Sequence, residues 1–179
     1  MAIKVLIALT VIVVVLVVVI ATRPSEFRVE RTATMSAPAG VVFAHVNDFH
    51  HWGAWSPYAK RDPAMKKTIE GTPAGVGAIY TWSGNHEVGE GRTTIIESRP
   101  SELIRIKLEF VRPFAGTSTA EFTFKPEGAR TAVTWSLAGR NNFIAKAMGL
   151  VMNMDRMIGG DFEIGLAQMK SVVEAGPRQ

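Results

Sequence analysis

The chain has no cysteine among its 179 residues and only four histidines. The missing cysteines exclude disulfide bonds, thiolate metal ligands and a cysteine nucleophile. Three histidines, His45, His50 and His51, are clustered in the sequence. Their spacing differs from the i, i+4 pair that holds a metal ion on one face of a helix. Packing or surface roles are therefore favoured, and neither a metal site nor any other cofactor is expected.

Two common signatures of chemistry are absent or misplaced. There is no Gly-x-Ser-x-Gly nucleophile motif. Gly75-x-Gly77 precedes a predicted strand, whereas a dinucleotide-binding loop follows a strand and opens a helix. Basic residues number 20 against 16 acidic ones, and Lys4 and Arg23 flank an apolar run, which leaves 18 against 16. No basic cluster with interleaved aromatics occurs, so nucleic acid is not an expected partner.

A long apolar run opens the chain. Residues 5–21 contain only Thr10 as a mildly polar residue. With the flanking residues the run approaches the roughly 20 residues with which a helix crosses a bilayer. A cleaved signal peptide is the alternative, with a possible site after Ala21, but the run exceeds the usual apolar core of about 7–15 residues. Residues 1–22 are therefore predicted to be an uncleaved membrane anchor, which makes the membrane a partner. Basic residues on both sides leave the orientation open.

The rest of the chain is predicted to be residues 23–26 as a linker, 27–175 as one folded domain and 176–179 as a tail. Residues 26–35 alternate between apolar and polar and predict a strand with Arg31 on its apolar face. Ser36 is predicted to cap a short helix with Pro38 in its first turn. Short turns then separate six further predicted strands, typical of an antiparallel meander, at 64–70, 78–82, 86–97, 104–110, 117–125 and 131–137.

The last stretch, residues 142–175, predicts a long helix. Its apolar residues recur every three or four positions and form one apolar face, which a sheet would cover. Gly159-Gly160 is predicted to interrupt this helix, since each interior glycine costs about 1 kcal/mol relative to alanine. The Met-rich half before the break would then shift to admit a ligand. The alternative is one continuous helix whose small residues allow close approach to the sheet.

Several motifs fall within this order of one strand, short helices, six strands and a long helix. They are Trp52-Gly-Ala-Trp55-Ser56-Pro57, Gly75-Val-Gly77 before Tyr80-Thr-Trp82, Gly89-Glu-Gly-Arg92, and the Met-Asp-Arg-Met run at 154–157. Together they resemble the polyketide cyclase/dehydrase-like branch of the SRPBCC superfamily, related to START lipid-transfer domains. The resemblance implies an α+β helix-grip fold, with about seven curved antiparallel strands around a C-terminal helix and two short helices after the first strand. It also implies a deep apolar cavity.

Eight residues are predicted to line that cavity and bind its ligand: Tyr80, Trp82, Ile106, Phe122, Trp135, Met154, Met157 and Phe162. Trp52 and Trp55 have two interpretations. They either staple the short helices to the sheet, which is favoured, or form the rim of the cavity mouth.

One strand face carries ionisable groups, because His86, Glu90 and Arg92 share its phase with Val88. If this face points inward, Glu90 or Arg92 could serve an enzyme as acid, base or oxyanion partner. If it points outward, it is an ordinary solvated face. The phase of the strand does not decide between the two, and the outward arrangement is favoured.

Three functions follow as hypotheses. The leading one is a membrane-tethered, non-catalytic module that binds a small apolar or lipid-like molecule. The second is an enzyme of cyclase or dehydratase type acting in the same cavity, and the third is a protein-interaction adaptor whose cavity is filled by its own side chains. The cavity discriminates among them by its size and by the ionisable groups that converge in it.

Overall fold

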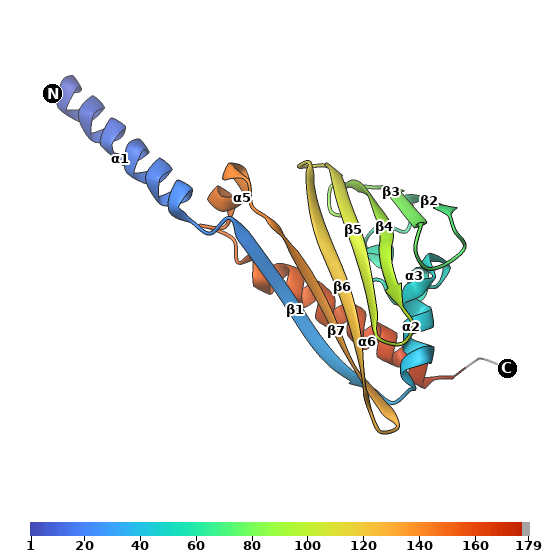
Figure 1. The fold of residues 1–179 in the computed structure, drawn as a ribbon. Coiled ribbons are helices and arrows are strands. Elements are labelled where there is room, and N and C mark those ends of the chain that lie inside the picture. The colour runs from blue at the N-terminus through green and yellow to red at the C-terminus, as the bar shows by residue number, and fades with distance from the viewer. Residues whose placement is uncertain (177–179) are drawn as a thin grey trace.

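Seven antiparallel strands form one curved sheet in the computed structural model, which describes residues 1–176 (Figure 1). The strand order across the sheet is β1-β7-β6-β5-β4-β3-β2, so β2 to β7 form a meander and β1 joins the last strand. The strands are β1 (Glu26–Met35), β2 (Lys66–Gly71), β3 (Ala78–Ser83), β4 (Glu90–Arg99), β5 (Leu103–Arg112), β6 (Gly116–Glu127) and β7 (Arg130–Arg140). The predicted α+β helix-grip fold is confirmed.

The helices lie at the two ends of the chain and between β1 and β2. They are α1 (Ala2–Thr22), α2 (Ala39–Asn47), the 3-10 turn η1 (Phe49–His51), α3 (Trp52–Trp55), α4 (Tyr58–Arg61), α5 (Phe143–Met148) and α6 (Met154–Glu174). Helix α6 runs along the sheet and packs mainly against β1 (Figure 1). The predicted cap at Ser36 is wrong, because α2 begins after Pro38. The backbone N–H of Ser36 instead donates to Glu174 Oε1 at 2.6 Å, which ties the end of β1 to the end of α6.

The core lies between the inward face of the sheet and α6. Phe122 and Trp135 stack with ring centroids 4.9 Å apart, and Trp135 stacks on Phe162 of α6 at 4.1 Å. Trp55 is fully buried, and its indole N–H donates to the His45 carbonyl at 3.0 Å. Trp52 makes the same kind of bond to Val46. These two bonds hold the short helices against α2. The contact with the sheet that was predicted is made by Trp55, whose ring packs on Phe122 at 6.0 Å and on Trp135 at 5.7 Å.

The predicted break at Gly159-Gly160 is wrong. Helix α6 is continuous from Met154 to Glu174, and the chain breaks earlier, between α5 and α6. Asn153 caps α6 there by accepting a bond from the Arg156 N–H at 2.9 Å. Gly159 is small because a Cβ at that position would collide with the guanidinium of Arg31. The continuous helix with close approach to the sheet is therefore the correct alternative. Without a break at these glycines, the predicted shift of the Met-rich half has no hinge to occur at.

Arg31 is the charge that the sequence placed on the apolar face of β1. It lies against α6, where its guanidinium bonds Asp155 at 3.0 Å and Glu163 at 2.7 Å. Hydrogen bonding to Arg31 lowers the pKa of the Asp155 carboxyl. The charge is compensated, so Arg31 joins β1 to the helix that crosses it.

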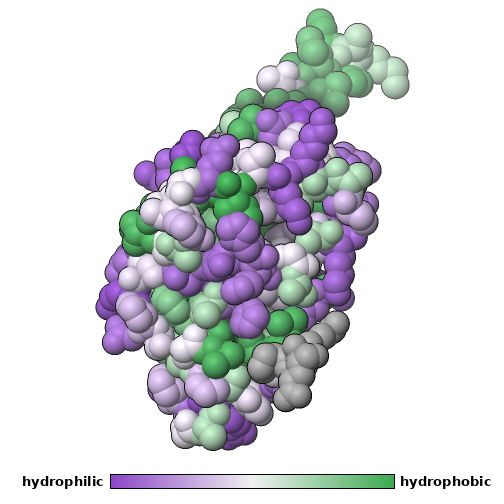
Figure 2. All heavy atoms as spheres, turned by 90° about the vertical axis from the view of Figure 1, so that its right-hand side faces the viewer, coloured by the Kyte–Doolittle hydropathy of each residue, from purple (hydrophilic) through white to green (hydrophobic). Residues whose placement is uncertain are grey.

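Helix α1 projects away from the domain as a separate rod (Figure 1). Its 21 residues make a helix that is long and apolar enough to cross a membrane. A signal sequence near an N-terminus meets the same two criteria. Figure 2 shows the contrast between this mostly hydrophobic helix and the mixed surface of the domain, on which hydrophilic residues predominate.

Candidate functional site

A cavity of about 780 Å³ lies between the inward face of the sheet, the short helices and α6. Seven of the eight predicted residues line it: Tyr80, Trp82, Ile106, Phe122, Trp135, Met154 and Phe162. Other apolar side chains complete the wall: Phe27, Phe49, Trp52, Met65, Ile69, Val88, Leu108, Phe110, Ala120, Leu137 and Ile158. The cavity is thus predominantly hydrophobic, as ligand-binding cavities are.

Met157 is the one predicted lining residue that does not line the cavity. Its side chain is 46% exposed and points to solvent. Successive residues of a helix are rotated by about 100°. Met154, Ile158 and Phe162 therefore form the inward stripe, and Met157 lies to one side of it.

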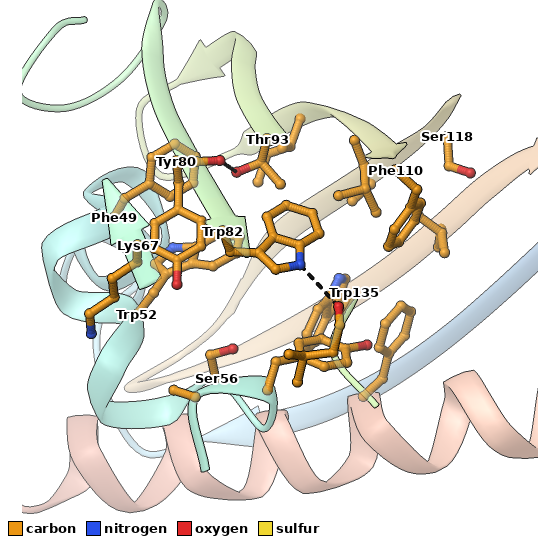
Figure 3. A pocket seen from close by; sticks show the side chains of 18 of the residues that line it. Phe49, Trp52, Ser56, Lys67, Tyr80, Trp82, Thr93, Phe110, Ser118 and Trp135 are labelled. Carbon is orange, nitrogen blue, oxygen red and sulfur yellow. Dashed lines mark hydrogen bonds between the residues drawn. The ribbon is translucent and has the colours of Figure 1, made fainter. Parts of the chain in front are cut away.

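One end of the cavity is an aromatic cluster of Phe49, Trp52, Tyr80 and Trp82. The rings of Phe49 and Trp52 are 4.8 Å apart, and Tyr80 stacks on Trp82 at 6.3 Å. Figure 3 shows the Trp82 indole in the middle of the site, with its N–H bonded to the Val88 carbonyl at 3.0 Å. Trp52 thus lines the cavity in addition to bonding to α2.

Trp135 forms part of the wall where the sheet meets α6. Its side chain is buried, with 5% exposed, yet its indole Nε1 has no hydrogen-bond partner among residues 1–176. An unpaired buried donor costs about 1–3 kcal/mol. Of the three buried side-chain atoms without a partner in this part of the chain, only Trp135 Nε1 belongs to a residue that lines the cavity. The alternation of β7 predicted where Trp135 points, but no sequence signal marked its N–H as unpaired.

Tyr58 is a polar residue of the wall that the sequence did not single out. Burial, and then the nearby Asp161 charge, raise the pKa of its hydroxyl, so Tyr58 stays neutral and can donate a hydrogen bond. Asp161 is itself buried and bonded to Arg61, with one contact at 3.1 Å. Its pairing with Arg61 depends on a tertiary contact between α4 and α6.

Glu90 and Arg92, the candidate catalytic residues, lie outside the cavity. In β4, Gly91, Thr93 and Ile95 are buried, so Glu90 and Arg92 point to the outer face of the sheet. Glu90 accepts a bond there from Arg112 Nε at 2.7 Å. The outward arrangement is therefore the one observed.

The strand β4 begins four residues later than predicted, at Glu90. His86 consequently lies in the loop before it, where the Gly84 N–H donates to the Gly89 carbonyl at 2.9 Å and closes the turn.

Few ionisable groups reach the cavity. Its lining includes His50, Lys67 and Glu87, and among the described residues no ion pair joins any two of them. His50 pairs instead with Asp48 at 2.7 Å. The remaining polar groups are single hydroxyls, which include Ser56, Tyr58 and Ser118. The arrangement can hold an apolar molecule and offer it isolated hydrogen bonds.

A second cavity of about 540 Å³ adjoins the first one at the base of α1. It is lined by the linker, α5 and the segment before α6: Arg23, Pro24, Phe27, Asn141, Ala145, Lys146, Gly149, Leu150, Val151, Met152, Asn153 and Met154. Phe27 and Met154 line both cavities and therefore form the partition between them.

The sequence model of a family described as polyketide cyclase / dehydrase and lipid transport matches residues 26–174. Solved structures show the same fold. A structural-genomics protein from Chromobacterium violaceum has a TM-score of 0.60 at 17% identity, covering 87% of this chain and 100% of its own. The Aha1 dimer from Colwellia psychrerythraea gives 0.61 at 12%, covering 85% and 99%.

The di-domain ARO/CYC protein BexL from the BE-7585A biosynthetic pathway gives a TM-score of 0.62 at 16% identity. It covers 90% of this chain, which spans 54% of BexL. At these identities the structures show the fold alone. A comparison with curated protein sequences gives no match.

Proposed function

The chain belongs to the polyketide cyclase / dehydrase and lipid transport family, and we propose that it is a membrane-tethered module that binds a small apolar molecule. One observation carries the proposal: a predominantly apolar cavity of about 780 Å³ between sheet and helix, whose described ionisable lining residues form no ion pair with one another. This volume lies in the range of about 300–1,000 Å³ that small-molecule sites occupy. A filled cavity, as the adaptor hypothesis requires, is not what the side chains form.

The residues of the cavity wall indicate which chemical class of ligand fits. Aromatic rings at one end suit a flat or fused-ring group, and the aliphatic part suits a chain. The unpaired Trp135 N–H is buried within the wall, so a ligand meets it only once a neighbouring side chain moves aside; a ligand with one oxygen acceptor, such as a carbonyl, would then pair it. The proposed ligand is therefore an amphipathic aromatic or single-chain lipid with an acceptor that reaches Trp135.

The length and exposure of α1 support the proposal that it tethers the domain to a membrane. It is about 31 Å long at 1.5 Å per residue, which matches the roughly 30 Å hydrocarbon core of a bilayer. Within it only Ile20 is buried, so α1 does not serve as a core helix of the domain. The linker 23–25 is short, and the cavity is held close to the membrane surface.

An enzyme remains the second candidate, because Tyr58 presents a neutral hydroxyl beside Asp161 at the cavity wall. Such a group could donate a hydrogen bond to a substrate carbonyl. Tyr58→Phe would then abolish turnover while leaving binding largely intact. A simple binding module shows no turnover in either form.

The binding proposal is tested by filling the cavity. Ala120 lies on the inward face of β6 and lines the cavity, and its neighbour Thr119 faces outward. The full-length protein in lipid nanodiscs is titrated with fluorescent acetylanthracene, with empty nanodiscs as the background. Saturable binding of one probe per chain is expected for the natural protein and for Thr119→Trp, and its loss for Ala120→Trp. Equal binding by a folded Ala120→Trp protein would place the site elsewhere.

A further inference from the structure

The segment from Phe143 to Met152 lies beside the last turn of α1. Ile20, the one buried residue of α1, belongs to the turn that meets α5. Lys146 Nζ of α5 donates to the Ala21 carbonyl at 3.3 Å. Figure 1 shows α5 at the base of the projecting helix, at the end of the domain nearest to it. The segment 143–152 therefore lies at the level where α1 ends.

This level coincides with the edge of the bilayer when α1 spans it. The length of α1 is only enough to cross the hydrocarbon core, so its last turn cannot lie far outside. Because Lys146 of this segment bonds to Ala21 in the last turn of α1, the segment must then meet the boundary between hydrocarbon and headgroups.

The outward side chains of this segment match that environment. Phe143 and Ile144 are 51% and 53% exposed, and Val151 and Met152 are 85% and 40% exposed. Arg23 and Lys146 beside them are cations that suit the headgroup layer. The exposed apolar patch continues the apolar surface of α1, so the partner that fits it is the same bilayer.

The second cavity opens within this patch. Val151 and Met152 belong to its wall, and Phe27 and Met154 separate it from the main cavity. A molecule that leaves the bilayer at this point meets the second cavity first. The side chains of Phe27 and Met154 then lie between the molecule and the main cavity. Methionine adapts readily to such passage because its side chain is unbranched and has three rotatable bonds.

We propose that residues 143–152 insert into the membrane interface and form the route by which a single-chain amphiphile passes from the bilayer, between Phe27 and Met154, into the main cavity. This proposal rests on the proposed binding function. It adds the source of the ligand, the bilayer itself, and the place where the ligand crosses into the protein.

Insertion is tested with single cysteines, which the cysteine-free chain allows without background. Val151→Cys is labelled with an environment-sensitive nitrobenzoxadiazole dye in full-length protein in phosphatidylcholine/phosphatidylglycerol vesicles. The matched control is Val76→Cys, because Val76 is also an exposed valine, 54% exposed, and lies in the β2–β3 turn at the opposite end of the sheet. Lipids with spin-labelled chains should quench the dye at position 151 and not at 76. Equal, weak quenching at both sites would overturn insertion.

Passage is tested by the rate of loading. Dansyl-undecanoic acid is supplied in the same vesicles, and energy transfer from the cavity tryptophans reports its arrival. Val151→Glu should slow loading about tenfold or more at unchanged final occupancy, and Val76→Glu should load like the natural protein. Normal loading by folded Val151→Glu would refute the route alone. Absence of loading in every variant would refute both the binding function and the route.

Discussion

Replacing Trp135 with phenylalanine tests whether the cavity is built for a ligand with an oxygen acceptor. The indole N–H is the only atom removed that can make a hydrogen bond. A phenyl ring in its place can still stack on Phe162 and Phe122, whose centroids lie 4.1 Å and 4.9 Å from the indole. The substitution therefore separates the hydrogen bond from most of the apolar contact.

The expected effect on the free protein is small. Removing an unpaired buried donor relieves about 1–3 kcal/mol. Losing the smaller ring of the indole costs about 2 kcal/mol, at roughly 0.8 kcal/mol per buried carbon. The two terms nearly cancel, so the free energy of unfolding should change by no more than about 1 kcal/mol, which denaturant titration measures.

The effect on binding should depend on the probe. A neutral hydrogen bond contributes about 0.5–1.5 kcal/mol, so acetylanthracene should bind the Trp135→Phe protein about three- to tenfold more weakly. Ethylanthracene has nearly the same shape without the carbonyl, and its affinity should be unchanged. Equal losses for both probes would refute the assigned hydrogen bond and leave Trp135 as an ordinary wall residue.

Three further measurements test the packing of α6, the role of α1 and the titration of His45. Gly160 of α6 has no neighbour within 4 Å of an added Cβ, whereas a Cβ at Gly165 would lie 2.7 Å from the Trp135 ring. Gly160→Ala should therefore stabilise the fold by about 1 kcal/mol, and Gly165→Ala should destabilise it by about 1–3 kcal/mol. Thermal unfolding that ranks the two variants the other way would contradict this packing. The full-length protein should resist extraction of membranes with alkaline carbonate, while a chain starting at Ser25 should be released; a cleaved N-terminus in mature protein would show a signal sequence instead. Burial, reinforced by the nearby His51 charge, lowers the pKa of the His45 imidazole below its ordinary 6.5. The unfolded state therefore binds more protons, and the free energy of unfolding should fall as the pH drops from about 6.5 to 5, a range above that in which carboxylates titrate. A His45→Gln protein with the same pH profile would assign that loss to another group.

The sheet was predictable because a half-buried strand has a period of two. In β1 the alternation located the charged Arg31 on the inward face, and in β5 and β7 it located Ile106 and Trp135 in the cavity. In β4 the phase alone was ambiguous, because glycine at position 91 gives no hydrophobic signal. The structure resolves it: Gly91 faces inward, where a Cβ would lie 2.5 Å from the Trp82 ring.

The terminal helix was predictable in its existence but not in its boundaries. Two adjacent glycines carry the stronger local signal for a break, yet α6 continues through them because Gly159 gives room to Arg31. The observed break lies where α5 turns to pack on α1, a contact between segments more than 120 residues apart. Local propensity contains no information about such contacts.

The cavity between the sheet and α6 is proposed to hold an apolar molecule taken from the cell. Native mass spectrometry of the full-length protein, extracted in polymer-bounded native nanodiscs without detergent, tests it most directly. A small molecule should remain bound to the natural protein and to Thr119→Trp, at one per chain, and be absent from Ala120→Trp. Retention of the same molecule by a folded Ala120→Trp protein, or its absence from all three proteins, would contradict the account.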